Sequence, residues 1–465
     1  MNHSEVFRPE AGRPAGDPAL RADRYVLRNA LVMTMDDDLG DFERADVLVE
    51  GQTIAAVGTD LAVDSVSYDC QNRIVLPGFV NSHHHMFQTA LRGYWSDALS
   101  EDYFRQSRRG ERALFHIYTP EDVYWGEHAG ALEQLSAGTT TVVDTSQCTE
   151  TPEHTDAAIR GIKDSGVRAV YAYCAKANGS TPHPSYAYPG DATRLREEFF
   201  ASEDQLVTLA LGSPVDESTW RLAKDLGLPL YTHINDRAAG LELERLTAKG
   251  LGGQRSTYIH CTGLAESTWE VIARSGARVS LSTYVEQTLS TGASGLQHSL
   301  WHGLEPSLST DAVSLGPTDF FSTMRATFAL QRSRLQERAL AGEGVGDPAI
   351  DTREILRMAT IYGARAAHLE HRIGSLTPGK QADIIVLDAN TLNASPVHHA
   401  TGTVVMLMDT SNVEMVIVGG RIRKSGGRLL DADVDAVTAA LRQSGQGLLA
   451  RSGTPQILFG SCRQG

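Results

Sequence analysis

The sequence predicts an α/β protein in which a (β/α)8 TIM-like barrel carries a small β-sandwich domain formed from both termini. Short β-rich runs alternate with helical patterns through residues 77–373, as in a barrel of parallel strands. Strand-like segments punctuated by turn residues gather before residue 77 and again after residue 373. Histidine and aspartate residues follow several central runs, and chemistry at strand C-terminal ends favours a barrel over the alternative, a doubly wound open sheet.

Residues 1–23 are polar, lack an apolar segment of signal-peptide length, and are interpreted as a flexible arm. Residues 24–76 and 374–430 hold the strand-like segments that predict the composite β-sandwich domain, and residues 431–465 are expected to form a C-terminal helix and tail. Between them, the predicted barrel strands are 79–82, 140–144, 167–174, 206–213, 230–233, 257–260, 277–282 and 307–311.

Composition restricts the class of protein. The formal net charge of −15 argues against nucleic acid or an anionic membrane as a partner, since like charges repel. No segment is apolar enough to span a bilayer, and a cytoplasmic location is expected. The five cysteines are scattered without a CxxC pair, so no disulfide framework is predicted.

The most informative motif is the apolar run that ends in His83-His84-His85. Strand side chains alternate with period two, so His83 and His85 share one face while His84 is expected to pack behind it. Two imidazoles on one rigid face can bind the same metal ion. Three more predicted strands end in metal-binding residue types, at His233, His260 and Asp311.

With these motifs the chain resembles the amidohydrolase superfamily from Tyr25 to Arg428. The resemblance rests on the run from Pro77 to His85, on Gly138-Thr139-Thr140-Thr141-Val142-Val143-Asp144, on the three later strand ends, and on the string 374–388 (GSLTPGKQADIIVLD). It implies that four residues bind the metal: His83, His85, His233 and Asp311. It further implies that His260 contacts the attacking water or the substrate oxygen, and that Asp311 accepts the proton of that water.

The resemblance also bears on the number of metal ions. Relatives with two ions bridge them by a lysine at the end of strand four, and residues 206–214 contain none. Lys176 follows the preceding strand and is interpreted as a loop lysine or a substrate contact. We therefore expect one divalent metal per chain, Zn²⁺ first, with Fe²⁺ or Co²⁺ as alternatives.

Asp236 departs from the family pattern, because deaminase relatives place a glutamate three residues after the strand-five histidine. Two interpretations stay open: Asp236 is a catalytic proton donor, or it has a structural role and caps a loop or orients Asn235. The predicted substrate contacts are Gln88, Trp95, Tyr188, Tyr284 and Glu286. They suggest a pocket for a small apolar aromatic substrate, although the aromatic residues could instead pack the rim and Glu286 could hold its own loop.

The nearest branch by resemblance contains the phenylurea hydrolases and molinate hydrolase, which are related to the triazine hydrolases. The residues that carry this resemblance are 83–88, 233–236 and 280–287. The expected reaction is hydrolysis of an N-aryl urea, such as a phenylurea herbicide, to an aniline. Alternatives are deamination or dechlorination of a purine, pterin or triazine ring, hydrolysis of a thiocarbamate or carbamate, and a non-catalytic metal-binding role. A homodimer or larger homo-oligomer is expected.

Overall fold

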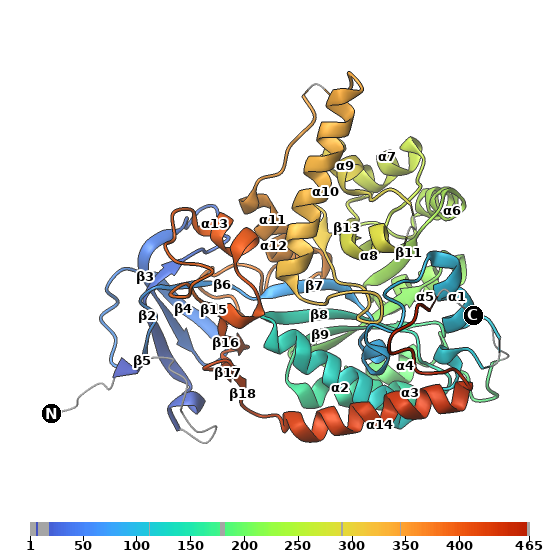
Figure 1. Ribbon diagram of the computed structural model, residues 1–465, viewed down its shortest axis with the longest axis horizontal. Helices are drawn as coiled ribbons and strands as arrows, with labels where there is room; N and C mark the ends of the chain where they lie inside the picture. Colours follow the sequence, from blue (N-terminus) through green and yellow to red (C-terminus); the bar gives the residue numbers. More distant parts are fainter. Residues whose placement is uncertain are drawn as a thin grey trace.

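The computed structural model describes residues 6–7, 18–110, 112–176, 182–289, 292–344 and 346–462. Within them lie an eight-stranded parallel sheet that curves into a barrel and a ten-stranded sheet built from both ends of the chain. Figure 1 shows the ten-stranded sheet on one side of the barrel. The predicted (β/α)8 barrel with a terminal β domain is thereby confirmed.

The barrel strands follow one another in sequence order, and each pairs with its neighbour in parallel. They are β7 (Phe79–His84), β8 (Thr139–Ser146), β9 (Arg168–Cys174), β10 (Val207–Ser213), β11 (Leu230–Ile234), β12 (Ser256–His260), β13 (Arg278–Leu281) and β14 (Ser307–Leu308). All eight coincide with predicted runs, but β14 ends at Leu308 and is much shorter than the predicted 307–311. The backbone turns left-handed three residues later, at Asp311 (φ 58°).

The barrel closes between its first and last strands. An isolated parallel bridge pairs His84 with Asp311. The Asp311 carbonyl accepts the His85 N–H at 2.8 Å, and the Asp311 N–H donates to the His83 carbonyl at 3.2 Å. The residues expected to hold the metal therefore belong to the ladder that closes the barrel.

Helices follow the strands and cover the barrel. They are α2 (Pro120–Ser136), α3 (Pro152–Ser165), α4 (Ala192–Glu198), α5 (Glu217–Leu226), α6 (Arg237–Ala248), α7 (Glu266–Ser275), α8 (Thr283–Thr288), α9 (Leu296–Trp301), α10 (Phe320–Leu340), α11 (Thr352–Ala359) and α12 (Ile361–Ala366). Their starts follow local chemistry: Thr119 and Asp122 form a capping box at α2, and Asp216 caps α5. Between β7 and β8 lies a separate layer of η2 (Met86–Leu91), α1 (Ser100–Arg108) and η3 (Leu114–His116).

The terminal sheet joins the two ends of the chain where β6 and β15 pair antiparallel. Its strands are β2 (Arg24–Val32), β3 (Phe42–Glu50), β4 (Thr53–Gly58), β5 (Val66–Asp69), β6 (Arg73–Pro77), β15 (Ile384–Asp388), β16 (Val413–Val418), β17 (Arg421–Ser425) and β18 (Arg428–Leu429), with the two-residue β1 at its edge. Alternate residues such as Val47 and Ile384 point into a core of their own. A buried ion pair fixes this sheet to the barrel, since Arg168 Nε lies 2.8 Å from Asp383 Oδ2.

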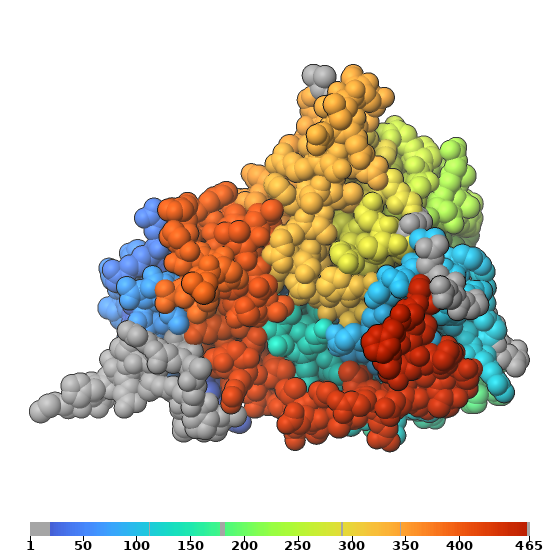
Figure 2. Space-filling view, in the orientation of Figure 1, coloured from blue at the N-terminus to red at the C-terminus, as the bar shows by residue number. Residues whose placement is uncertain are grey.

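The two ends of the chain both contact the body. Of the predicted flexible arm, Val6–Phe7 (β1) pairs with β5 and Pro18–Arg21 forms a 3-10 turn, while 1–5 and 8–17 lie outside the described residues. The C-terminal helix α14 (Val434–Ser452) runs beside α2 (Figure 1), and the tail beyond it lies across the segment that contains α1 (Figure 2). There the side-chain amide of Gln106 donates to the Cys462 carbonyl at 2.8 Å. No helix in the described part of the chain is long and apolar enough to cross a membrane.

Candidate active site

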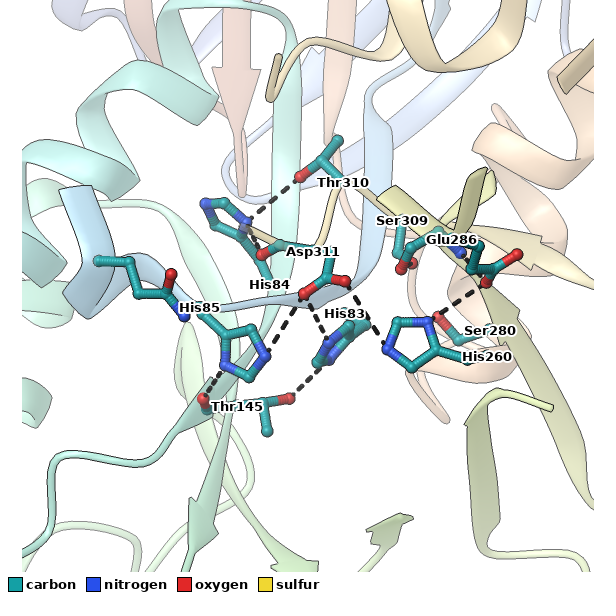
Figure 3. A network of polar contacts seen from close by, with 12 residues as sticks. His83, His84, His85, Thr145, His260, Ser280, Glu286, Ser309, Thr310 and Asp311 are labelled. Carbon is teal, nitrogen blue, oxygen red and sulfur yellow. Dashed lines mark hydrogen bonds and ion pairs between the residues drawn. The ribbon is translucent and has the colours of Figure 1, made fainter. Parts of the chain in front are cut away.

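The floor of the site is built on the end of β7. His83 and His85 are both buried, and each uses its Nδ1 to contact Thr145 on the adjacent β8 (Figure 3). For His85 the partner is the Thr145 carbonyl at 2.7 Å, which can only accept, so Nδ1 carries the proton and Nε2 is free to bind a metal. For His83 the partner is the Thr145 hydroxyl at 2.8 Å. Thr145 therefore sets the orientation of both imidazoles.

His233, at the end of β11, brings a third imidazole to this floor. Its ring centroid is 4.8 Å from that of His83 and 5.7 Å from that of His85. One potential ligand atom from each of the three histidines lies within 4.8 Å of the others. His83 Nε2 is buried and makes no hydrogen bond within the described part of the chain. A buried, unpaired nitrogen beside two further imidazoles fits a bound metal ion.

Asp311 completes the donor set from the closing strand. Its Oδ1 lies 3.5 Å from Nε2 of both His83 and His85, which is longer than a good hydrogen bond. Its left-handed backbone, like that of His260 (φ 68°), is an uncommon conformation for a non-glycine residue and costs about 1–2 kcal/mol. Strain of this kind gathers at functional sites.

Electrostatics prepare these groups for a cation. Burial lowers the pKa of His83, His85 and His233, so the imidazoles are neutral and have a free electron pair. Burial alone would raise the pKa of Asp311, but the contact with His83 and the charge of His260 hold it well below its usual range. Three neutral imidazoles and one carboxylate are a donor set that Zn²⁺ accepts.

A second carboxylate reaches the floor from the opposite direction. Glu286, on α8, is buried, and its Oε1 accepts the Ser282 N–H at 2.8 Å while lying 3.3 Å from His260 Nδ1. The opposite edge of the same imidazole points toward Asp311, and His260 Nε2 lies 3.7 Å from Asp311 Oδ2 (Figure 3). Burial would lower the pKa of His260, but the bond to Glu286 and the charge of Asp311 outweigh it and raise that pKa. Glu286 Oε2 is buried and has no hydrogen-bond partner among the described residues.

The floor opens into a cavity of about 500 Å³. His85, His233, His260, Glu286 and Asp311 all border it. Its apolar walls come from two sides of the barrel mouth: Tyr103 and Phe104 on α1, and Val285, Leu289 and Leu315 around α8 and the loop after Asp311. Charged side chains at the wall are Arg108, Lys176 and Glu242.

Four of the five predicted substrate contacts do not border this cavity. The segment after His85 turns into the buried helix η2 and is covered by α1. Gln88 is therefore fully buried and donates to the Tyr103 hydroxyl at 3.1 Å, and Trp95 donates to Gln106 at 3.0 Å. The Tyr188 hydroxyl donates to the Gly212 carbonyl at 2.8 Å, and Tyr284 packs against Gly316. Of the five predicted contacts, Glu286 alone borders the cavity.

Asp236 also differs from its catalytic interpretation. It is the N-cap of α6 and accepts the Ala239 N–H at 2.8 Å with its side chain exposed. The cavity is bordered there by Asn235 and Ala238 instead. His84 lies behind the site, as expected, with Nδ1 2.6 Å from the Asp311 carbonyl.

Lys176 borders the cavity 3.2 Å from Glu150. The sequence does not predict the contribution of α1 to the cavity, because Tyr103, Phe104 and Arg108 belong to no motif. Their only signal in the sequence is the gathering of aromatic and basic residues in 103–109.

Comparisons with known proteins agree with this architecture. The model of the amidohydrolase family matches residues 74–423. A 5-methylthioadenosine/S-adenosylhomocysteine deaminase from Desulforudis audaxviator is 27% identical over 446 residues, 90% of this chain and 97% of that protein. A 5'-deoxyadenosine deaminase from Methanosarcina mazei is 26% identical and covers 92% of this chain and 98% of its own length.

Two solved structures share the fold. One is an adenosine deaminase from Xanthomonas campestris with bound zinc, with a TM-score of 0.79, 24% identity, and coverage of 92% of this chain and 98% of that chain. The other is an atrazine chlorohydrolase from Arthrobacter aurescens complexed with zinc, with a TM-score of 0.78, 22% identity, and coverage of 90% and 100%. The chain therefore belongs to the amidohydrolase family and is a hydrolase that acts on carbon–nitrogen bonds other than peptide bonds.

Proposed function

We propose that this protein hydrolyses the carbon–nitrogen bond of an N-aryl urea and releases an aniline. The observation that carries the proposal is the position of Asp236, whose carboxylate caps α6 and is not part of the cavity wall. A ring deaminase must protonate a ring nitrogen and hydrogen-bond several polar ring edges. Attack on an exocyclic carbonyl needs fewer polar contacts: one carbonyl at the floor and an apolar place for the N-substituent.

The cavity suits that simpler requirement. Its aromatic side at Tyr103 and Phe104 and its aliphatic side at Val285 and Leu289 can sandwich a flat ring. The unpaired Oε2 of Glu286 is available to accept a urea N–H. A thiocarbamate or carbamate would present the same carbonyl to the floor and belongs to the same proposed class.

His83, His85, His233 and Asp311 would hold one divalent metal, with Zn²⁺ first and Fe²⁺ or Co²⁺ as alternatives. When bound, the metal supplies Lewis acidity, which lowers the pKa of a water to about 7 and polarises a carbonyl. Asp311, whose carboxylate lies beside the His83 and His85 imidazoles, would accept the proton of the water as it attacks. Glu286 Oε1 accepts from His260 Nδ1, and the raised pKa of His260 favours the imidazolium, whose Nε2–H can donate to the reacting carbonyl oxygen.

Collapse of the attacked carbon breaks its bond to the aryl nitrogen. Asp311 returns its proton to that nitrogen, which leaves as a neutral aniline rather than a poor amide anion. The remaining carbamic acid breaks down to carbon dioxide and an alkylamine. The proton that Asp311 accepts from the attacking water is thus the proton that it gives to the departing aniline nitrogen.

A second candidate, deamination of an adenine nucleoside, is favoured by the names of the similar curated proteins. One experiment separates the two. Metal-loaded protein is incubated in parallel with 1,1-dimethyl-3-phenylurea, 5'-deoxyadenosine and atrazine, with Asp311→Asn as the inactive control, and products are identified by mass. Aniline supports the proposal. Deaminated nucleoside, or chloride from the triazine, with no aniline from the urea would overturn it.

A further inference from the structure

Arg108 lines the wall of the cavity that lies opposite His260 and Glu286. Arg108 is the last residue of α1, and its Nη2 donates to Gln147 Oε1 at 3.1 Å. Gln147 directly follows β8, whereas His260 ends β12, four strands further around a barrel of eight. The guanidinium therefore approaches the cavity from the wall opposite the groups proposed to handle the substrate carbonyl and N–H.

Where the structure describes the chain, Arg108 lacks the oppositely charged partner that the other two charged residues of the cavity wall, Lys176 and Glu242, each have. Lys176 Nζ lies 3.2 Å from Glu150 Oε1, and Glu242 accepts from Arg245 Nε at 2.7 Å. By contrast, no carboxylate in the described ranges pairs with Arg108, and its Nε is buried without a hydrogen-bond partner there. A buried N–H on a cation without an acceptor is costly, so an acceptor supplied by a ligand would be favoured.

Neighbouring aromatic rings do not meet this need. The guanidinium carbon lies 5.1 Å from the centroid of Phe104 and 5.9 Å from that of Phe115. Such packing stabilises the flat faces of the group, but the N–H donors lie in its plane. The two rings therefore pack against the guanidinium without accepting its in-plane N–H groups. Gln147 accepts from Nη2 and the Tyr103 hydroxyl also contacts the group, while Nε has no acceptor among the described residues.

We propose that Arg108, positioned by Gln147, binds a carboxylate or similar oxyanion carried by the aromatic ring of the substrate. This inference rests on the proposed function and narrows its substrate class to N-aryl ureas with an acidic ring substituent. A planar guanidinium fork matches the two oxygens of a carboxylate, and Gln147 Nε2 offers a further donor beside it. The scissile carbonyl would then lie at the floor, the urea N–H at Glu286 Oε2, and the acidic group at Arg108.

The test compares two substrates that differ only in charge, 3-(3-carboxyphenyl)-1,1-dimethylurea and its methyl ester. The wild-type kcat/KM should favour the acid by about 10- to 100-fold, the range expected for a charged hydrogen bond. Arg108→Met should abolish that preference, and Arg108→Lys should restore part of it, because lysine keeps the charge without the fork.

Arg109→Met is the matched control. It removes the same charge one residue away, where the guanidinium pairs with Glu101 and does not border the cavity, so both activities and the preference should be unchanged. Equal kcat/KM for acid and ester in the wild type, or an Arg108→Met variant that keeps the preference, would overturn the subsite.

A binding measurement makes the test independent of turnover. Calorimetric titration with benzoate should give a dissociation constant at least about 10-fold weaker for Arg108→Met than for wild type and Arg109→Met. Thermal melting establishes that all three proteins are folded. If no urea is cleaved but benzoate binding depends on Arg108, the proposed reaction fails and the anion subsite stands. If neutral ureas are cleaved and benzoate binding ignores Arg108, the subsite fails and the reaction stands.

Discussion

Two strand ends in this barrel carry a carboxylate into the helix that follows, yet the two carboxylates have different roles. After β11, Asp236 occupies the N-cap of α6, where it accepts a backbone N–H and faces solvent. After β13, Ser282 occupies the N-cap of α8, and Glu286 lies four residues later, buried beside His260. The residue nearer in sequence to a ligand histidine is thus the one excluded from the cavity.

The position of a carboxylate relative to the start of the helix therefore decides its role. An aspartate at an N-cap is held by the unpaired N–H groups of the first turn, and its short side chain cannot also reach inward. A longer glutamate within the first turn can reach back to the N-cap N–H with one oxygen and present the other to the cavity. Distance along the sequence from a ligand is a poor guide to catalytic position.

The largest effect is expected when the imidazole of His233 is removed, because this is the group that β11 contributes to the site. His233→Ala should lose bound metal, from about one ion per chain to substoichiometric, and turnover should fall below detection. Metal content by mass spectrometry and product formation check both. An active His233→Ala protein with full metal content would show that the site is assembled from other groups.

A smaller loss is expected for the carboxylate after β13. Glu286→Gln keeps the side-chain length but removes the charge that orients His260, and kcat should fall roughly 10- to 100-fold, as for other groups that orient a catalytic residue. Glu242→Gln is the control, since it changes a carboxylate at the cavity wall that pairs with Arg245. Equal kcat in the two variants would assign Glu286 to packing alone.

The Glu286→Gln variant should also have a changed pKa at His260. In the metal-free protein burial would lower the pKa of His260, but its hydrogen bond to Glu286 and the charge of Asp311 raise it. Removing the glutamate charge destabilises the imidazolium, so the His260 pKa should decrease in Glu286→Gln. NMR titration of that imidazole measures the change, and an unaltered pKa would mean that the two side chains do not interact in solution.

The smallest effect belongs to Asp236. Asp236→Ala removes the cap of α6 and should lower the free energy of unfolding by about 1 kcal/mol, while kcat stays close to wild type. Asp236→Asn, which caps equally well, should restore the stability. Urea unfolding and steady-state kinetics give both quantities, and a large drop in kcat for Asp236→Asn would return this residue to the catalytic set.

The sequence was sufficient for the fold and for the floor of the site. Alternating strands and helices fix where each strand ends, and residues such as His83, His233 and Asp311 stand at those ends, so their convergence follows from barrel geometry. The residues that form the walls of the cavity could not be predicted from the sequence in the same way. Whether Gln88 or Arg108 meets the cavity depends on how η2 and α1 fold over the barrel mouth, and this is set by tertiary packing rather than by a local pattern.

The ladder that closes the barrel has a further consequence for stability. His84 and Asp311 are bridged although they are 227 positions apart, and the ligand residues flank this bridge on both strands. An ion held there would cross-link the first strand of the barrel to the last and would oppose the chain entropy that favours their separation. Chelation should therefore lower the melting temperature as well as the activity, and amide hydrogens along β7 and β14 should be the first to exchange faster.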